Sequence, residues 1–156
     1  NDLLGVEAHT FDEYSCILGN MKTRMLWHKK AQGLVTDGAI RDLQMVSDEY
    51  DLAGFAKNRS PAGNLPFLES FEEGRPVNVG GVLVMPGDVI VGDDDGVVVV
   101  PADRAEEVID WIEEQEEAEE FVIGLIDEEQ ASPGKYYPIS AETKERFRKW
   151  KAEKGE

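Results

Sequence analysis

The chain has 156 residues, of which 41% are hydrophobic, and this length and composition indicate one globular domain. Its 33 acidic and 16 basic residues give a formal net charge of −17, which argues against binding to nucleic-acid phosphates and favours basic partners or cations. No apolar run approaches the roughly 20 residues of a membrane span. With no signal-peptide pattern and a single cysteine, Cys16, which is expected to be a small buried hydrophobe, the sequence predicts a cytoplasmic protein.

The first half of the chain alternates predicted helices and strands. The segment 12–30 is mostly compatible with a helix, and Gly19-Asn20 is a break at which a helix can begin, because Asn is a good N-cap. The elements that follow are a strand, a short helix, the start of another strand and an irregular loop, over residues 33–36, 43–49, 55–56 and 57–64 respectively.

The second half changes from strands to helix. Strands are predicted at 77–84, 88–91 and 97–100, because valine-rich runs alternate there with Gly, Pro and Asp turns. Residues 103–129 then show a helical apolar period and contain 13 acidic residues, which a solvated helix face, a salt-adapted source or a basic partner would each explain. The end from Glu142 is a helix or a frayed tail. The mixture predicts an α/β fold.

Arg41 and Asp42 are the strongest candidates for chemistry. The apolar run that begins at Gly33 ends in a turn that places the two side chains next to each other. A guanidinium grips a carboxylate in two-pronged fashion, and an adjacent carboxylate can hold a hard divalent cation, so the pair suits an oxyacid bound against a metal. An ordinary solvated ion pair is the alternative interpretation of any Arg-Asp dipeptide.

Other motifs do not predict a site. Asp93-Asp94-Asp95-Gly96 lacks the alternate acids and the terminal Glu of a calcium loop, and is predicted to be a turn between strands. His9 and His28 have no cysteine partners at zinc-finger spacing, so zinc is unsupported.

Together with the segment 76–101, the Arg-Asp motif resembles the family of the regulator of ribonuclease activity A (RraA) and the class II 4-hydroxy-4-methyl-2-oxoglutarate aldolases. The resemblance runs from about Gly19 to Pro101 and continues more loosely to residues 132–138. It implies the layered β/β/α swivelling-domain fold, with part of the usual N-terminal region lacking, since the motif is reached after only forty positions. We expect one RraA-like domain over residues 1–156, with its motif core at 19–101, an acidic helix at 103–129 and a tail at 130–156.

The resemblance also implies roles for individual residues. It implies that Arg41 binds the carboxylate of a pyruvyl group and that Asp42 is the ligand of magnesium or manganese. It implies a Gly-acid-Leu type loop whose amides bind substrate, and that loop corresponds here to Gly19, Asn20, Met21 and Lys22. Asn20 stands at the spacing of the acid and cannot take up a proton at neutral pH, and Met45 stands where some members carry another acid.

Two functions follow as expectations. The first is a divalent-metal-dependent lyase that cleaves or decarboxylates a 2-oxo acid and releases pyruvate, as a pyruvate aldolase or oxaloacetate decarboxylase does. Its catalytic residues would be Arg41, Asp42 and Asn20. The second is a non-catalytic RraA-like regulator that binds a ribonuclease or another basic protein, which the negative charge favours. The resemblance further implies a homotrimer or a hexamer.

Overall fold

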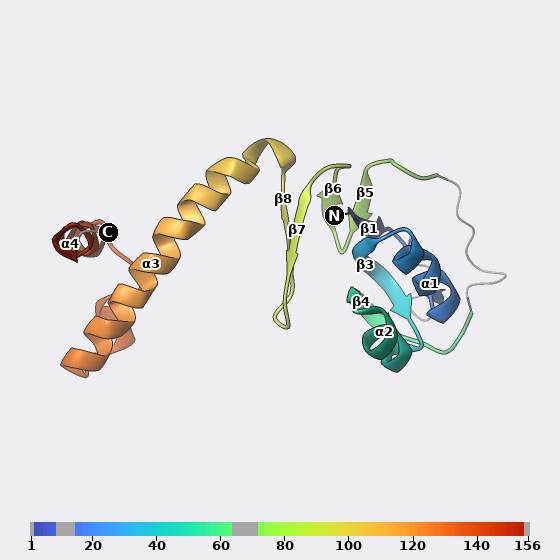
Figure 1. Cartoon of the computed structure of the whole chain (residues 1–156), viewed down its shortest axis with the longest axis horizontal. Helices are drawn as coiled ribbons and strands as arrows, with labels where there is room; N and C mark the ends of the chain where they lie inside the picture. Colours follow the sequence, from blue (N-terminus) through green and yellow to red (C-terminus); the bar gives the residue numbers. More distant parts are fainter. Residues whose placement is uncertain (1, 9–14, 64–71, 155–156) are drawn as a thin grey trace. The chain divides into compact units, whose positions relative to one another are not determined.

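The computed structural model describes residues 2–8, 15–63 and 72–154 (Figure 1). His9, the first residues of the predicted helix at 12–30 and the last residue of the predicted loop at 57–64 lie outside these ranges. The chain divides into two compact units, Asn1–Ala102 and Asp103–Glu156. No helix among the described residues has the length and apolar character needed to cross a membrane.

A parallel sheet is the centre of the first unit, and β3 (Ala31–Ile40) is its central strand. One edge of β3 pairs with β4 (Ala53–Arg59), and the other edge pairs first with β1 (Asp2–Val6) and then with β2 (Cys16–Leu18). The helix predicted over 12–30 is therefore wrong at β2, where a three-residue strand is too short to show a period. Strand β4 likewise extends to Arg59, into the segment predicted as loop.

A one-residue bulge interrupts β3 near its end. Thr36 pairs with Ala56 and Ala39 pairs with Asn58, so three steps along β3 match two along β4. Gly38 lies in this bulge, where a Cβ would come within 2.7 Å of the Ala8 Cβ. Only glycine fits this close approach without moving the neighbouring segment.

The two faces of the sheet are covered by different elements. On one face the buried Leu18, Leu34 and Ile40 pack against Leu26 of α1 (Asn20–His28) and Leu43 of α2 (Leu43–Tyr50). On the other face, two hairpins lie against the sheet: β5 (Val77–Val79) with β6 (Val82–Val84), and β7 (Val89–Gly92) with β8 (Val97–Val100). These layers are hairpins, sheet and helices, so the predicted β/β/α fold is confirmed.

The first hairpin corrects the strand predicted over 77–84. Gly80 and Gly81 have φ of +61° and +89° and form its turn, which divides the valine run into two short strands. The Asp93–Gly96 segment is the turn of the second hairpin, as predicted. There the Asp93 carboxylate accepts the Asp95 and Gly96 amide N–H groups at 2.9 and 3.2 Å.

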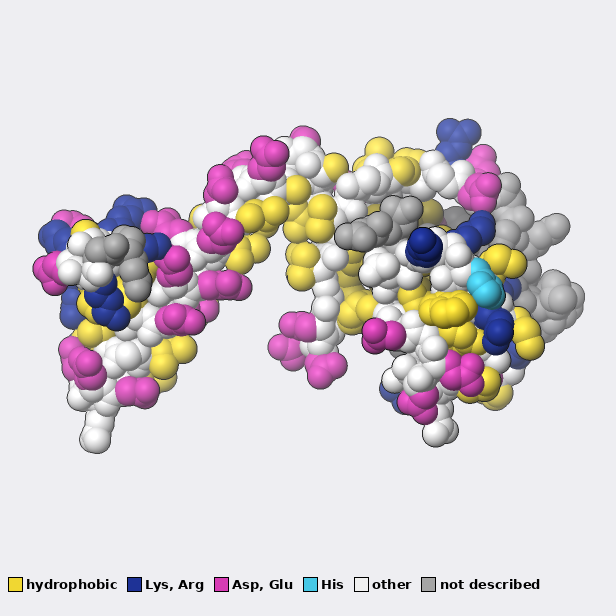
Figure 2. Space-filling view, in the orientation of Figure 1, with side chains coloured by type: hydrophobic (Ala, Val, Ile, Leu, Met, Phe, Trp, Pro, Cys, Tyr) yellow, Lys and Arg dark blue, Asp and Glu magenta, His cyan; other side chains and the backbone are white. Residues whose placement is uncertain are grey.

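The second unit is a pair of helices, α3 (Ala105–Glu129) and α4 (Ala141–Lys154). Ala118 and Val122 of α3 and Phe147 of α4 are buried, and the Phe147 ring lies 6.0 Å from the Phe121 ring, centroid to centroid. Acidic side chains run along α3 and basic ones gather on α4 (Figure 2), and Glu114 pairs with Arg148 at 2.6 Å. The acidic helix predicted at 103–129 is thus present, and part of its charge is neutralised by the helix that follows it.

Candidate functional site

Arg41 and Asp42 follow β3 directly, at the carboxyl end of the sheet. The Arg41 amide donates to the Leu18 carbonyl at 3.0 Å, which ties the pair to the end of β2. Asp42 has φ 60° and ψ 32°, a left-handed conformation that is uncommon for a residue with a side chain, and it is the N-cap of α2. This conformation turns the carboxylate away from its own helix and towards α1.

Gly19 allows both side chains to approach the start of α1. A Cβ at this position would lie 2.8 Å from the Arg41 Nε and 2.9 Å from the Asp42 Oδ2. The φ of Gly19 is −141°, which any residue can adopt, so the close approach and not the backbone conformation requires glycine here.

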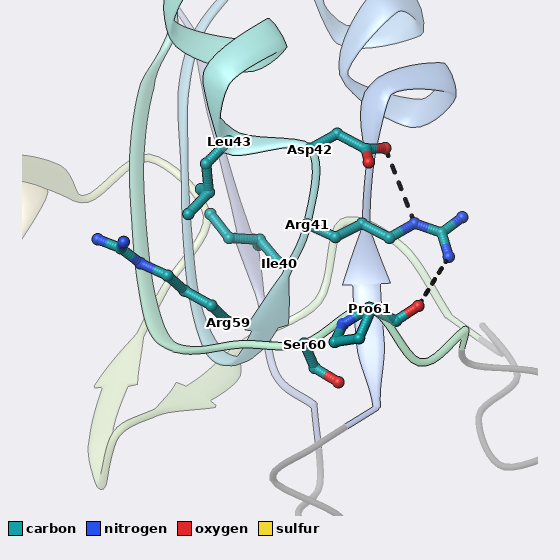
Figure 3. A pocket seen from close by; sticks show the side chains of 7 residues that line it. All are labelled: Ile40, Arg41, Asp42, Leu43, Arg59, Ser60 and Pro61. Atoms are coloured by element: carbon teal, nitrogen blue, oxygen red, sulfur yellow. Dashed lines mark hydrogen bonds and ion pairs between the residues drawn. The ribbon is translucent and has the colours of Figure 1, made fainter.

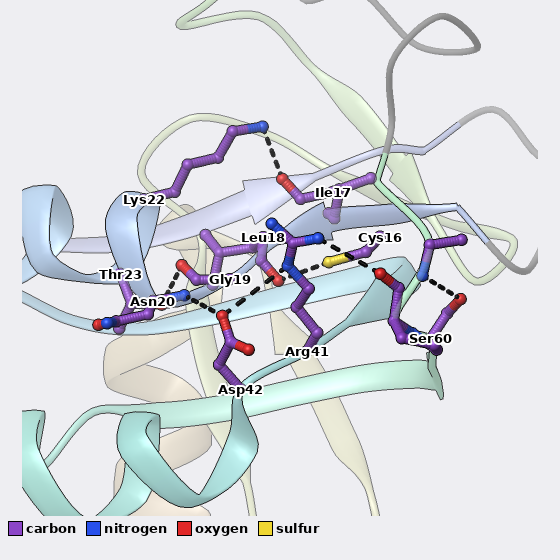
Figure 4. Close-up of polar contacts among 12 residues, drawn as sticks. Cys16, Ile17, Leu18, Gly19, Asn20, Lys22, Thr23, Arg41, Asp42 and Ser60 are labelled. Atoms are coloured by element: carbon purple, nitrogen blue, oxygen red, sulfur yellow. Dashed lines mark hydrogen bonds and ion pairs between the residues drawn. The ribbon is translucent and has the colours of Figure 1, made fainter.

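The Asp42 carboxylate receives an N–H group from the first residue of α1. Its Oδ2 accepts the Asn20 amide N–H at 2.9 Å and lies 3.8 Å from the Arg41 Nε (Figure 4). This amide is one of the donors that the first turn of a helix leaves without an intrahelical partner. The other oxygen, Oδ1, accepts no hydrogen bond within the described part of the chain, and the side chain is 39% exposed.

The Arg41 guanidinium lies at the edge of a pocket of about 510 Å³ (Figure 3). Its Nη1 donates to the Pro61 carbonyl at 3.3 Å, so one end of the fork is oriented by the chain that follows β4. Apolar side chains form the middle of the pocket, and the lining residues are Ile40, Arg41, Asp42, Leu43, Arg59, Ser60 and Pro61. An anionic group with a short apolar part fits this combination.

The predicted substrate-binding loop, residues 19–22, reaches the site through its backbone, because the Asn20 amide N–H donates to Asp42. Gly19 is the N-cap of α1 and Asn20 its first residue, so the prediction that Asn20 caps the helix is wrong. The side chain of Asn20 turns to α2, where its Oδ1 accepts the Tyr50 hydroxyl at 2.6 Å. Met21 is 80% exposed, and the Lys22 amine donates to the Ile17 carbonyl at 2.7 Å, so neither side chain lines the pocket.

Several residues at the site were not found from the sequence. Arg59, Ser60 and Pro61 reach the pocket because Ile40 pairs with Arg59 across the parallel strands and the Ser60 amide donates to the Ile40 carbonyl at 3.1 Å. Neither contact has a local sequence signal. The Arg59 side chain lies on the side of the pocket opposite Arg41, and its guanidinium points away from Arg41 (Figure 3).

The donor set at Asp42 fits a weakly chelated hard cation. Among the described residues there is no cluster of three or more His, Cys, Asp and Glu side chains that could hold a metal ion. Met45, at the position where the resemblance implies a further acid in some members, is 40% exposed on α2. Magnesium often keeps several waters and takes one or two carboxylates, so a single half-exposed carboxylate with a free oxygen is compatible with it.

The family model described as RraA-like, Aldolase/RraA, matches residues 1–99. The chain belongs to the RraA-like family. The predicted resemblance is thereby confirmed, and the match ends at the boundary region between the two compact units.

Relatives in this family carry different names. An uncharacterized protein of Methanocaldococcus jannaschii, MJ0644, is 40% identical over 82 residues, which cover 53% of this chain and 38% of the relative. A putative 4-hydroxy-4-methyl-2-oxoglutarate aldolase of Halalkalibacterium halodurans is 37% identical over 84 residues, covering 49% of this chain and 36% of the relative. The segments that match therefore span little more than a third of either relative.

A solved structure is similar over a longer part of the chain. It is Streptomyces coelicolor RraAS2, described as an unusual member of the RNase ES inhibitor RraA protein family. The TM-score is 0.68 and the identity 38%, over 77% of this chain and 60% of that one. The relatives thus include proteins named as an aldolase and as a member of an inhibitor family.

Proposed function

We propose that the protein is a lyase that cleaves or decarboxylates a 2-oxo acid at the Arg41–Asp42 pocket and releases pyruvate. The observation that carries this proposal is the arrangement of the pair around Gly19, which leaves the guanidinium fork and Asp42 Oδ1 open beside one pocket. The relative named as a putative aldolase supports the same reaction class.

Arg41 binds the substrate carboxylate. Its Nη1 contact with the Pro61 carbonyl orients the planar fork, and the remaining N–H donors can form parallel hydrogen bonds to two carboxylate oxygens. The apolar wall of Ile40 and Leu43 covers the carbon chain of the substrate. In this proposal, the carbonyl group of the bound acid faces Asp42.

Asp42 is the protein ligand of a divalent cation, magnesium or manganese, in this proposal. The Asn20 amide N–H holds Asp42 Oδ2 by a hydrogen bond. The other carboxylate oxygen, Oδ1, is left to bind the cation. When bound, the cation supplies positive charge next to the keto oxygen, where charge develops as a carbon–carbon bond breaks. The Gly19–Lys22 loop contributes backbone amides to substrate binding.

Pyruvate release is the direct test. The purified chain is incubated with Mg²⁺ or Mn²⁺ and offered oxaloacetate or 4-hydroxy-2-oxo acids. We expect metal-dependent pyruvate release that Asp42→Ala abolishes and Arg41→Lys lowers, because an ammonium cannot reproduce the two-pronged grip on a carboxylate. Arg75→Lys, at an exposed arginine paired with Glu72, is the matched control and keeps the parent rate. Release that is equal in parent and Asp42→Ala contradicts the proposal.

A second candidate is a non-catalytic regulator that binds a basic region of a ribonuclease or another protein. It is favoured by the similarity to RraAS2 and by the net charge of −17. A regulator of this kind gives no pyruvate with any of these substrates, and its partner binding weakens steeply as salt is raised.

A further inference from the structure

Tyr50 is a buried tyrosine close to the candidate site that the proposed chemistry does not use. It is the last residue of α2, it is 6% exposed, and its hydroxyl donates to the Asn20 Oδ1 at 2.6 Å. The Trp27 ring lies 6.2 Å from the Tyr50 ring, centroid to centroid, so α1 also contacts the phenol ring. The direction of the hydroxyl is therefore set by two contacts with one helix.

Both ends of α2 are bound to the same residue of α1. The N-cap, Asp42, accepts the Asn20 amide N–H through Oδ2, and the last residue, Tyr50, donates to the Asn20 side chain. A movement of Asn20 away from the carboxylate would therefore also strain the bond to Tyr50. The result is a closed ring of Asp42, α2, Tyr50 and Asn20.

We propose that Tyr50 is a positioning residue: through Asn20 it holds the first amide of α1 against the Asp42 carboxylate and so fixes the orientation in which Asp42 Oδ1 is presented. Cation binding at Asp42 belongs to the proposed function, whereas the contact between amide and carboxylate does not depend on it.

The first test measures the contact itself. In Tyr50→Phe, which removes only the hydroxyl, the Asn20 amide proton resonance should move towards the position it has in Asp42→Asn. Tyr136→Phe is the matched control, because Tyr136 is also buried and donates to a carboxylate, Glu129 Oε2 at 2.7 Å, in the other unit. We expect no movement of the Asn20 resonance in this control. An Asn20 resonance that stays unmoved in Tyr50→Phe overturns the proposal.

The second test measures the consequence for the carboxylate. Mn²⁺ alone is titrated into the full chain, and the dissociation constant should rise about 2- to 10-fold in Tyr50→Phe, the range that follows from losing one neutral hydrogen bond. Asn20→Ala removes the acceptor of the same hydrogen bond. If both side chains act through this bond, the double variant should bind Mn²⁺ no more weakly than the single variant with the lower affinity. Fully additive losses contradict the ring, because they mean that the two side chains act separately.

The outcomes separate this inference from the proposed function. If the parent binds Mn²⁺ and Tyr50→Phe weakens binding while no pyruvate is released by either, Tyr50 is a positioning residue and the lyase reaction is wrong. If pyruvate is released but Tyr50→Phe changes neither the Asn20 resonance nor the Mn²⁺ affinity, the positioning role is wrong and the lyase stands. Should the parent bind no Mn²⁺, the cation site fails, and the resonance alone decides the role of Tyr50.

Discussion

Gly19 is the residue on which the geometry of the Arg41–Asp42 pair most depends. The two side chains occupy the space that a Cβ at this position would take. The glycine is therefore required by its neighbours across space, and its own backbone conformation would accept other residues. A substitution here should alter the site while leaving the sheet intact.

Gly19→Ala is predicted to lower pyruvate release by on the order of 10²-fold, because a displacement of about 1 Å at a reacting group commonly has that effect. The Arg41 Nε and Cγ, at 2.8 and 2.9 Å from the added atom, both have to move. Gly54→Ala is the control, since a Cβ there meets nothing within 4 Å. Steady-state rates and metal-dependent thermal stabilisation check the prediction, and parent-like values for both would contradict it.

Asn20→Asp is predicted to raise lyase turnover. A carboxylate still accepts the Tyr50 hydroxyl, and its second oxygen replaces the amide Nδ2, which has no partner among the described residues. General acid–base help is commonly worth about 10²- to 10⁴-fold. Asn78→Asp is the control, because its Oδ1 also accepts one N–H group, from Gly81 at 2.9 Å, outside the pocket. Turnover that remains at background while metal and oxyacid still bind means that the missing group lies elsewhere and favours the regulator.

At the level of single residues, the sequence predicts the Arg41–Asp42 pair but not the residues around it. Adjacency alone places Arg41 beside Asp42, and the family spacing brings Gly19 and Asn20 to them. Tyr50 and Arg59 were missed because their places depend on the length of α2 and on the pairing of Ile40 with Arg59. Such long-range contacts leave no local pattern in the chain.

Among the elements, the long helices are predicted more accurately than the short strands. The helical period from residue 103 continues for the full length of α3, which gives a strong signal. Strand β2 has three residues and forms only because β3 offers it an edge, so its helix-compatible composition is overridden by tertiary pairing. Gly80 and Gly81 form the hairpin turn that divides the valine run predicted as one strand.

The α3–α4 pair should lose stability in acid through Glu129. The Lys135 amine, at 2.5 Å from Oε2, and the Tyr136 hydroxyl hold the pKa of this carboxyl below its usual 4.5 in the folded state. A group whose pKa is lowered by folding stabilises the fold above its unfolded pKa, and that contribution is lost as the pH falls below about 4.5 towards the folded value.

Glu129→Gln removes this contribution, so the difference from the parent should be largest at neutral pH and should shrink in acid. Hydrogen exchange of the α4 amides, compared at each pH between the variant and the parent, measures the difference. Glu153→Gln, an exposed glutamate of the same helix pair, is the control. A difference that grows as the pH falls would contradict the stated direction of the pKa shift.

For the whole molecule, the apolar surface exposed on the hairpins is the feature that indicates association with a partner. Leu83, Val91 and Val98 are 62%, 57% and 63% exposed, on strands whose hairpins have only two strands each. We propose that copies of the chain cover this surface in a trimer or a dimer of trimers. The 156 residues would then act as one RraA-like domain within each copy.

Light scattering at micromolar concentration should therefore give the mass of three or six chains. Val98→Lys, which places a charge on the exposed hairpin face, should shift the mass towards one chain, whereas Lys149→Val, at an exposed position of α4, should not. A parent that is a clean monomer would contradict the assembly.

The bulge in β3 has a consequence for how the chain can vary. The one extra residue around Gly38 shifts every later residue of β3 by one place against β4. In this register Ile40 pairs with Arg59, and Arg41 follows it at the pocket. The site thus depends on the number of residues between Thr36 and Arg41 as much as on their identity. Substitutions in this stretch alter the pocket by degrees, whereas a single deletion would shift Ile40 and Arg41 together by one place against Arg59.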